Sequence, residues 1–371
     1  MKAIYIINVM KRLSEGLESH LILLKELGYE VHIAGDFSQY QGDIDEIPAI
    51  VKQIDLDRNP FKVKNIKAFI QMTNLMKIEK YDFVHCNTPV GGILGRMCSY
   101  VSGTKNVLYQ AHGFHFYKGA PKLHNFIYRN IEKFLARFTD SIITINKEDF
   151  EAAQKFRLRN DGKVYYVPGV GVDIEKYKTV VVDKSKKFKE IGISEEDKLI
   201  IMIGDLVSNK NYEVAIRAIS KIKRSNVKCI ICGVGSDNEK LMELVNSLGM
   251  NNKIHFLGFR KDIIELLKIS DIFLLTSKRE GLSRALMEAM SCNTAIVASK
   301  IRGNTDLIDD KGGFLKTFND VDGFKDAIEI LIKNDELRRN IELYNLEKIK
   351  KFSIDNVNQV MKKIYLEVLN D

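Results

Sequence analysis

Short apolar segments alternate with amphipathic helical segments along most of the chain, and this alternation constrains the fold more than any other feature. Such a pattern favours parallel sheets joined by helical crossover connections. Strands are expected near 2–8, 30–35, 82–86, 106–111, 140–145 and 163–167, and again near 199–204, 227–232, 253–257, 271–275 and 294–298. The sequence therefore predicts an α/β protein with two doubly wound, Rossmann-like domains.

A polar stretch at 179–198 interrupts the alternation and is expected to be an interdomain linker. It would separate an N-terminal domain, 1–178, from a C-terminal domain, 199–354, and 371 residues suffice for two hydrophobic cores. The basic run at 184–189 is interpreted as a solvated face of this linker. Apolar residues at helical spacing predict a last helix at about 355–371.

Composition excludes several classes of protein. The formal charge of +8 invites a nucleic-acid partner, but no helix-turn-helix, zinc-finger or aromatic RNA-binding signature accompanies it, so no nucleic acid is expected. No segment approaches the roughly 18 apolar residues of a spanning helix, and the apolar start is too short for a signal peptide. A cytoplasmic protein is expected. Five scattered cysteines indicate no disulfide framework.

Two carboxylates, Glu280 and Glu288, stand on either side of a strand–glycine–helix junction. The apolar run 271–276 is typical of a buried parallel strand, Gly281 breaks the chain, and a helix is expected from about 285. Glu280 would therefore lie at the C-terminal end of a strand, where open α/β sheets bind ligands.

The helix after Gly281 offers a second binding element. The backbone N–H groups of Leu282, Ser283 and Arg284 are expected to open this helix, and such groups bind phosphate. Glu288 would lie near the second helical turn, within reach of a ribose. Together these residues predict a nucleotide site.

The stretch Glu280–Glu288, with Ala289-Met290 and then Ala295–Ser299 after it, resembles the paired-glutamate motif of the family 4 retaining glycosyltransferases, which have the GT-B fold. Ala111–Tyr117 and Arg302–Ile308 also resemble the bacterial members that assemble capsular polysaccharide and exopolysaccharide. The resemblance covers nearly the whole chain. It implies two domains that face a cleft and a helix at 355–371 that crosses back onto the first domain.

A nucleotide-sugar enzyme must hold a diphosphate, which needs cations or aligned N–H groups. The resemblance implies that Gly204 and Lys210, on the loop after the first strand of the second domain, contact the donor phosphates. Many family members have an arginine directly after this glycine, where this chain has Asp205. Arg302 or Arg279 is the suggested replacement.

The first domain contributes two further candidates. Gly16 lies on the loop after the first strand, where the family often has two glycines that let the backbone approach the donor. An ordinary turn glycine is the alternative interpretation. His112 follows the strand near 106–111, and the resemblance implies that it lies beside the transferred sugar and assists the transition state.

The segment 114–138 combines cations with aromatic residues. Five cations, Lys118, Lys122, Arg129, Lys133 and Arg137, stand against the single anion Glu132, with Phe116, Tyr117, Phe126, Tyr128 and Phe134 interleaved. This composition suits the surface of an anionic membrane. The alternative is that the apolar residues belong to the core and the cations form a solvated face.

The resemblance implies a hexosyl- or N-acetylhexosaminyltransferase that moves a sugar from a nucleotide-diphosphate sugar, expected to be a UDP-sugar, to a polyprenyl-diphosphate-linked saccharide. The enzyme would work peripherally at the inner face of the plasma membrane. No metal and no other cofactor is expected, since Asp55-Leu56-Asp57 lies far in sequence from the donor motifs. Two alternatives are a UDP-sugar 2-epimerase of similar architecture and a non-catalytic basic membrane-binding protein.

Overall fold

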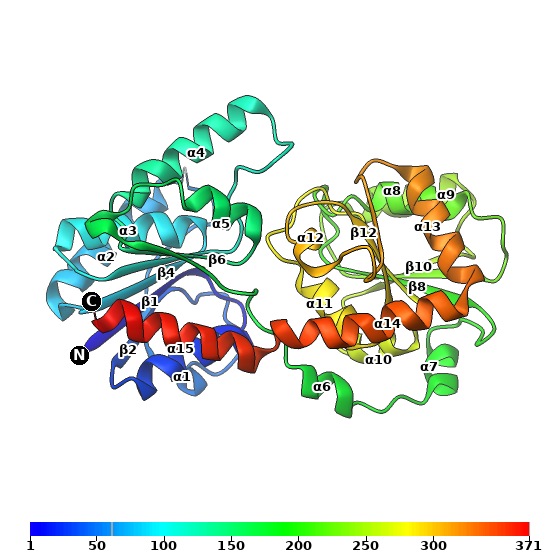
Figure 1. Cartoon of the computed structure of the whole chain (residues 1–371), viewed down its shortest axis with the longest axis horizontal. Coiled ribbons are helices and arrows are strands. Elements are labelled where there is room, and N and C mark those ends of the chain that lie inside the picture. Colours follow the sequence, from blue (N-terminus) through cyan, green and yellow to red (C-terminus); the bar gives the residue numbers. More distant parts are fainter. Residues whose placement is uncertain (61, 371) are drawn as a thin grey trace. The chain divides into compact units, whose positions relative to one another are not determined.

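A computed structural model describes residues 1–60 and 62–370 of the chain. These residues form two compact units (Figure 1). The first unit is Met1–Gly171 together with the chain from Ile354 onward, and the second is Val172–Ser353. The C-terminal end of the helix expected at 355–371 lies, at Asp371, outside the described residues.

The first unit is built on a seven-stranded parallel sheet with the strand order β3-β2-β1-β4-β5-β6-β7. Its strands are β1 (Lys2–Val9), β2 (Glu30–Asp36), β3 (Ile50–Gln53), β4 (Phe83–Asn87), β5 (Val107–Ala111), β6 (Ser141–Thr144) and β7 (Lys163–Tyr166). Its helices are α1 (Glu15–Glu26), α2 (Lys64–Glu79), α3 (Pro89–Ser102), α4 (Lys122–Ala136), α5 (Lys147–Ala153) and α15 (Ile354–Asn370). The strand order reverses direction between β1 and β4, as in doubly wound sheets.

The C-terminal helix α15 packs against α1 and completes the core of the first unit (Figure 1). Its buried face consists of Val357, Met361, Ile364, Tyr365 and Val368, spaced at three to four residues as the sequence predicts. The Tyr365 hydroxyl lies 2.8 Å from Nδ1 of His85 on β4, and Nε2 of His85 lies 3.1 Å from the Gln110 side chain on β5. A buried polar chain therefore joins the last helix to the middle of the sheet.

The second unit contains a six-stranded parallel sheet with the order β10-β9-β8-β11-β12-β13. Its strands are β8 (Lys198–Ile203), β9 (Val227–Cys232), β10 (Ile254–Gly258), β11 (Ile272–Leu275), β12 (Ala295–Ser299) and β13 (Phe314–Lys316). Its helices are α6 (Ile174–Thr179), α7 (Lys184–Glu190), α8 (Tyr212–Ser220), α9 (Asn238–Ser247), α10 (Ile263–Ile269), α11 (Arg284–Ser291), α12 (Asn304–Leu307), α13 (Val321–Lys333) and α14 (Asp335–Ile349).

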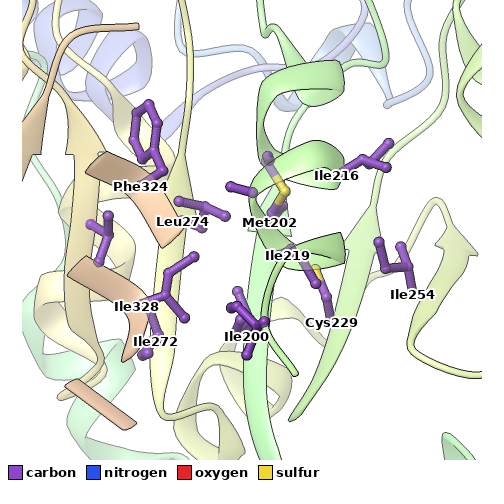
Figure 2. Packing of buried hydrophobic residues seen from close by; sticks show 14 of the residues in the cluster. Ile200, Met202, Ile216, Ile219, Cys229, Ile254, Ile272, Leu274, Phe324 and Ile328 are labelled. Carbon is purple, nitrogen blue, oxygen red and sulfur yellow. The ribbon is translucent and has the colours of Figure 1, made fainter. Parts of the chain in front are cut away.

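One face of this second sheet packs against α8 and α13 through aliphatic side chains (Figure 2). One buried cluster contains Ile200 and Met202 of β8, Ile272 of β11, Ile219 of α8 and Ile328 of α13. Because both faces of a parallel sheet are covered, its strands are continuously apolar, which is why the sequence indicates them clearly.

Two strands were not predicted, and both lie at the edge of a sheet. β3 has mixed polarity and no buried residue, and β13 has only three residues, all partly exposed. Edge strands bury little side-chain surface, so neither produces the apolar run by which the central strands are recognised.

The stretch 179–198 differs from its expected role as a linker, because it belongs to the second unit, which already begins at Val172. It contains helix α7, which packs against α10. Phe188 is buried, and the Lys187 ammonium lies within 2.9 Å of carboxylates of Glu190, Asp262 and Glu265. The basic run is therefore not wholly a solvated face, because three carboxylates compensate a cation that is mostly buried.

Candidate active site

The C-terminal ends of β8 and β11 bring Lys210 and Glu280 into contact. Lys210 Nζ donates to Glu280 Oε1 across 2.7 Å, and the two side chains are 21% and 13% exposed. β8 and β11 are neighbours in the sheet, and the strand order reverses direction between them. Open α/β sheets bind ligands at such a reversal. Two residues that the sequence predicted for separate donor contacts thus form one ion pair at the edge where a ligand is expected.

A set of hydrogen bonds holds the two loops that carry this pair. Asn209 Nδ2 donates to the carbonyl of Arg279 at 2.9 Å, and the Lys278 N–H donates to the carbonyl of Asn209 at 2.8 Å. Asn211 and Thr276 exchange side-chain to backbone hydrogen bonds in both directions. The loop after β8 is therefore fixed to the loop after β11, which sets the position of Lys210.

Gly204 ends β8 in a conformation that favours glycine, with φ of 145°. A Cβ at this position would lie 3.3 Å from Cε of Lys210, closer than most such contacts allow. The Gly204 carbonyl accepts a hydrogen bond from the hydroxyl of Tyr212 at 2.9 Å. The missing side chain of Gly204 therefore leaves room for the aliphatic part of Lys210.

Asp205 is an exposed acidic residue, so it supplies no cation at the position where many family members have arginine. Of the two suggested replacements, Arg302 is buried, and its Nε donates to the backbone carbonyl of Glu280 at 3.2 Å. The side chain of Arg279 is partly exposed. Arg302 thus lies beside the Lys210–Glu280 pair, while a contact between either arginine and phosphate stays a prediction.

Helix α11 begins immediately after Gly281 and Leu282. Ser283 is its N-terminal cap, and the Ser283 hydroxyl accepts a hydrogen bond from the Leu286 N–H at 3.3 Å. Arg284 is the first helical residue, so Ser283 and Arg284 lie at the helix start as expected, whereas Leu282 precedes it. The expected phosphate contact of these three N–H groups stays a prediction.

Glu288 lies in the second turn of α11 and pairs with an arginine of the same helix. Its Oε1 lies 3.0 Å from Nε of Arg284 on the preceding turn. Burial raises the pKa of Tyr177, a residue of α6, and the negative charge of Glu288 raises it further. Sequence reasoning missed Tyr177. The available signal was Ile174 and Tyr177 at helical spacing after Asp173, a residue type that favours the helix cap.

Gly16 is the second residue of α1. A Cβ on Gly16 would lie 2.5 Å from the carbonyl oxygen of Val170, so this glycine permits a close backbone contact inside the first unit. The contact accounts for Gly16 by packing alone, as in the turn-glycine interpretation. A donor contact of Gly16 stays a prediction.

His112 directly follows β5 and is partly buried. Loss of hydration lowers the pKa of His112 to about 4. The same cause lowers the pKa of His20, on α1, to about 3, and that of His85 well below 6.5. His112 is therefore neutral near pH 7, so it would act through a neutral imidazole or its backbone.

The segment 114–138 divides into a buried part and an exposed part. Phe114 and Phe116 are buried and stack with ring centroids 4.9 Å apart. Helix α4 extends beyond the rest of the first unit (Figure 1), and most of its apolar side chains are exposed, namely Leu123, Phe126, Ile127, Ile131 and Phe134. The core interpretation therefore holds for the start of the segment and for Leu135 and Ala136 at the end of α4, and not for the exposed apolar residues of α4.

The single anion of this segment is already neutralised. Glu132 pairs at 2.8 Å with Arg96 of α3, whose side chain is fully buried. The exposed charges of the segment are therefore positive. Among residues 1–60 and 62–370, no helix is long and apolar enough to cross a membrane.

One group of three potential metal ligands occurs in the described part of the chain. It consists of Glu30 and His32 at the start of β2 and Glu79 at the end of α2, all in the first unit. Glu79 already pairs with Lys2 at 2.6 Å and with Lys52 at 2.8 Å. The Glu79 carboxylate, which a metal cation would need as a ligand, is thus already paired with two ammonium groups.

The two halves of the chain match two family models. Residues 183–348 match the model described as glycosyl transferases group 1, and residues 16–146 match the model described as glycosyl transferase 4-like. The putative glycosyltransferase EpsD of Bacillus subtilis is 33% identical over 348 residues, which cover 92% of this chain and 90% of EpsD.

A second relative is named by its reaction. UDP-Gal:alpha-D-GlcNAc-diphosphoundecaprenol alpha-1,3-galactosyltransferase of Escherichia coli is 32% identical, over 74% of this chain and 72% of that enzyme. Among solved structures, Anabaena HepE in complex with UDP matches with a TM-score of 0.79 and 18% identity, over 99% of this chain and 100% of HepE.

Proposed function

Because the chain belongs to the group 1 glycosyltransferases and has the GT-B fold, we propose that it moves a sugar from a UDP-sugar to a lipid-linked saccharide, with retention of configuration. The observation that carries this proposal is the Lys210–Glu280 ion pair at the reversal of strand order in the second sheet. The E. coli relative, named as a UDP-Gal transferase acting on a diphosphoundecaprenol acceptor, supports both substrate classes.

Lys210 is proposed to bind the donor diphosphate. Glu280 pairs with the Lys210 ammonium and neutralises it. When a diphosphate arrives, the ammonium can contact its oxygens, and the Glu280 carboxylate is free to accept hydrogen bonds from the sugar hydroxyls. Negative charge grows on the leaving diphosphate in the transition state, where a positioned cation stabilises it most. Lys210 would therefore accelerate departure of the nucleotide.

The helix start at Ser283 and Arg284 is proposed to bind the same diphosphate, and Glu288 to bind the ribose hydroxyls. Helix N-termini bind anions through their free N–H groups and the helix dipole. With Lys210 beside them, these groups supply the positive potential that a metal would otherwise supply. We therefore propose that transfer needs no metal. His112 would assist the transferred sugar from the first unit, with no protein nucleophile involved.

The exposed face of α4 is proposed to contact the membrane that holds the acceptor. Leu123, Phe126 and Ile131 provide exposed apolar surface, and Lys122 and Arg129 provide cations on the same helix. Interfacial helices have two features: apolar residues that enter the headgroup region, and cations that lie near anionic lipids. Attachment to the inner face of the plasma membrane would place the enzyme next to its acceptor.

The experiment that tests the function is a transfer assay with a panel of UDP-sugars and synthetic saccharide-diphosphate lipids. We expect one UDP-sugar to give an extended lipid, with the α-anomer retained. A reaction with UDP-sugar alone separates transfer from 2-epimerisation. An epimer formed without acceptor, and no extended lipid from any donor, would contradict the proposal.

A further inference from the structure

A cavity of about 310 Å³ lies in the first unit, bordered by helices α4 and α5. Asn125, Arg129 and Lys133 line it from α4, and their spacing of four residues puts them on one side of that helix. Glu151 lines it from α5, and Lys155 lines it from the turn after that helix. The cavity therefore has walls from two helices, and Lys155 lies outside the segment 114–138.

Four cations and two carboxylates line this cavity, which leaves an excess of two positive charges. These residues are Lys118, Arg129, Lys133, Lys155, Glu148 and Glu151. Oε1 of Glu148 already accepts a hydrogen bond from the Lys118 N–H at 2.7 Å. In the part of the chain that the structure describes, the ammonium groups of Lys133 and Lys155 form no ion pair. The cavity is therefore suited to an anion.

Contacts within the first unit fix the walls of the cavity. Phe116 and Phe156, which also line it, are buried, with ring centroids 6.3 Å apart. The Arg129 guanidinium lies over the Phe116 ring, 5.1 Å from its centroid, in a cation–π arrangement. The Asn125 side chain accepts a hydrogen bond from the Tyr117 N–H at 3.0 Å and donates one to the Tyr117 carbonyl at 2.9 Å. A side chain that is already positioned loses little freedom when it binds a ligand.

An exposed apolar residue adjoins the basic side of α4. The side chain of Phe126 is 68% exposed. Phe126 precedes Arg129 by three positions and Lys133 by seven, and residues at these spacings lie on the same side of a helix. If Phe126 enters the headgroup region of a bilayer, the two cations come to the level of the lipid phosphates.

We propose that this cavity binds a phosphate group of a membrane lipid, whose oxygens Arg129 and Lys133 contact from α4 and Lys155 contacts from the other wall. The inference rests on the proposed membrane contact of α4 and adds a specific site to it. Cations bind phosphate through charge-assisted hydrogen bonds. A carboxylate has two oxygens in one plane, whereas the oxygens of a phosphate point in several directions, which suits cations on two walls. The cavity has room for many waters, so a phosphate group fits.

The test measures flotation of the full chain with vesicles for the wild type, Lys155→Ala and Arg157→Ala. Lys155 and Arg157 are both exposed cations after α5, and of these two only Lys155 lines the cavity, so the variants lose the same charge and differ in position. The vesicles consist of a phosphate-free galactolipid, charged to the same zeta potential by either phosphatidic acid or a fatty acid. With phosphatidic acid, we expect Lys155→Ala to weaken binding about threefold to tenfold and Arg157→Ala by less than about twofold. With the fatty acid, the two variants should bind alike.

A second measurement identifies the source of the phosphate. Calorimetry compares monomeric dihexanoyl phosphatidic acid with glycerol 3-phosphate and with inorganic phosphate. We expect the lipid to bind about tenfold more tightly than either soluble phosphate, because its acyl chains can contact the apolar surface beside the cavity. Equal affinity for inorganic phosphate would exclude a lipid as the source.

The inference fails if Lys155→Ala and Arg157→Ala float alike with phosphatidic acid vesicles. Thermal melting shows whether both variants are folded, and Lys155→Gln replaces Lys155→Ala if the latter is not. If the wild type floats with neither kind of vesicle, the membrane contact of α4 is wrong and this inference fails with it. The transfer assay with saccharide-diphosphate lipids still decides the catalytic proposal in that case.

Discussion

Lys210 and Glu280 are 70 positions apart in sequence, and their charged atoms lie 2.7 Å apart at the end of the second sheet. Each is partly buried and each lies on a loop fixed to the other loop. Removing either charge therefore leaves the other charge unpaired at a position where water reaches it only in part. The free energy of unfolding falls more than it does when a surface ion pair is lost.

Replacing Lys210 by alanine should lower kcat/KM for transfer about tenfold or more, since a hydrogen bond to a charged group contributes about 1.5–3 kcal/mol. Steady-state kinetics with saturating acceptor checks this. The control is Lys221→Ala, which breaks a pair with Asp322, also 2.7 Å long, between side chains that are both more than half exposed. Activity of Lys210→Ala within twofold of wild type would reject the proposed role.

Replacing Glu288 by alanine should weaken UDP binding and leave the protein folded. Glu288 is partly exposed, whereas the neighbouring Leu286, Met287 and Ala289 are buried in the core. The Kd for UDP is measured by calorimetry and the fold by thermal melting. An unchanged Kd would remove Glu288 from the nucleotide site.

Acid should destabilise the first unit before pH 4 is reached. Burial lowers the pKa of His20 to about 3 and that of His85 well below 6.5. Between pH 6.5 and 4 these histidines are protonated in the unfolded chain and remain unprotonated in the native state. The free energy of unfolding therefore falls as pH falls, by up to about 1.4 kcal/mol per pH unit for each histidine.

One carboxyl group acts in the opposite direction. Burial raises the pKa of Glu342, on α14 of the second unit, to about 7, so between pH 7 and 4.5 its protonation in the native state stabilises the second unit as pH falls. We still expect the melting temperature to fall from pH 7 to pH 5. The variant His20→Asn should show a shallower decline, and an identical decline would exclude His20 as a cause.

Chelation should leave transfer unchanged, because Lys210 and the start of α11 are proposed to neutralise the diphosphate. The measurement is the initial rate after dialysis against EDTA, with untreated enzyme as the reference. Loss of activity on chelation, restored by Mg²⁺ or Mn²⁺, would overturn the metal-free proposal.

Changing Lys118, Lys122, Arg129 and Lys133 together to serine should nearly abolish flotation with anionic vesicles. Each cation near such a bilayer contributes about 1 kcal/mol, and salt screens the attraction. The control changes four exposed cations of the second unit, Lys184, Lys186, Lys189 and Lys223, to serine, which alters the net charge equally. Flotation should survive in the control and decline with salt in wild type. If the first variant still floats, α4 is not the contact surface.

The sequence predicts the central strands of both sheets because their residues are buried on both faces. Ile200 and Ile272, for example, lie in continuous apolar runs. It does not predict β3 or β13, whose side chains remain partly exposed. It also suggests a linker at 179–198, since two of the three carboxylates that compensate Lys187, those of Asp262 and Glu265, are distant in sequence, and such a lysine looks the same in sequence as a solvated one.

The candidate site shows the same limit. Local pattern predicts that Glu280 lies at a strand end and Glu288 in the helix after Gly281, whereas Lys210 is suggested by the family resemblance. The contact between Lys210 and Glu280 cannot be predicted, since pairing across 70 positions depends on strand order. Tyr177 is hidden for a related reason: α6 precedes α11 by more than a hundred positions, and only the folded unit shows that they touch.

The position of α15 has a consequence for synthesis on the ribosome. The first unit needs Tyr365 to bond with His85, 280 positions earlier, and needs the apolar face of α15 to close its core. The second unit, Val172–Ser353, is complete before α15 emerges. The half of the chain that is translated first is thus the half that finishes folding last. One face of its sheet stays uncovered until translation reaches the final helix, and a chaperone can bind this face during that time.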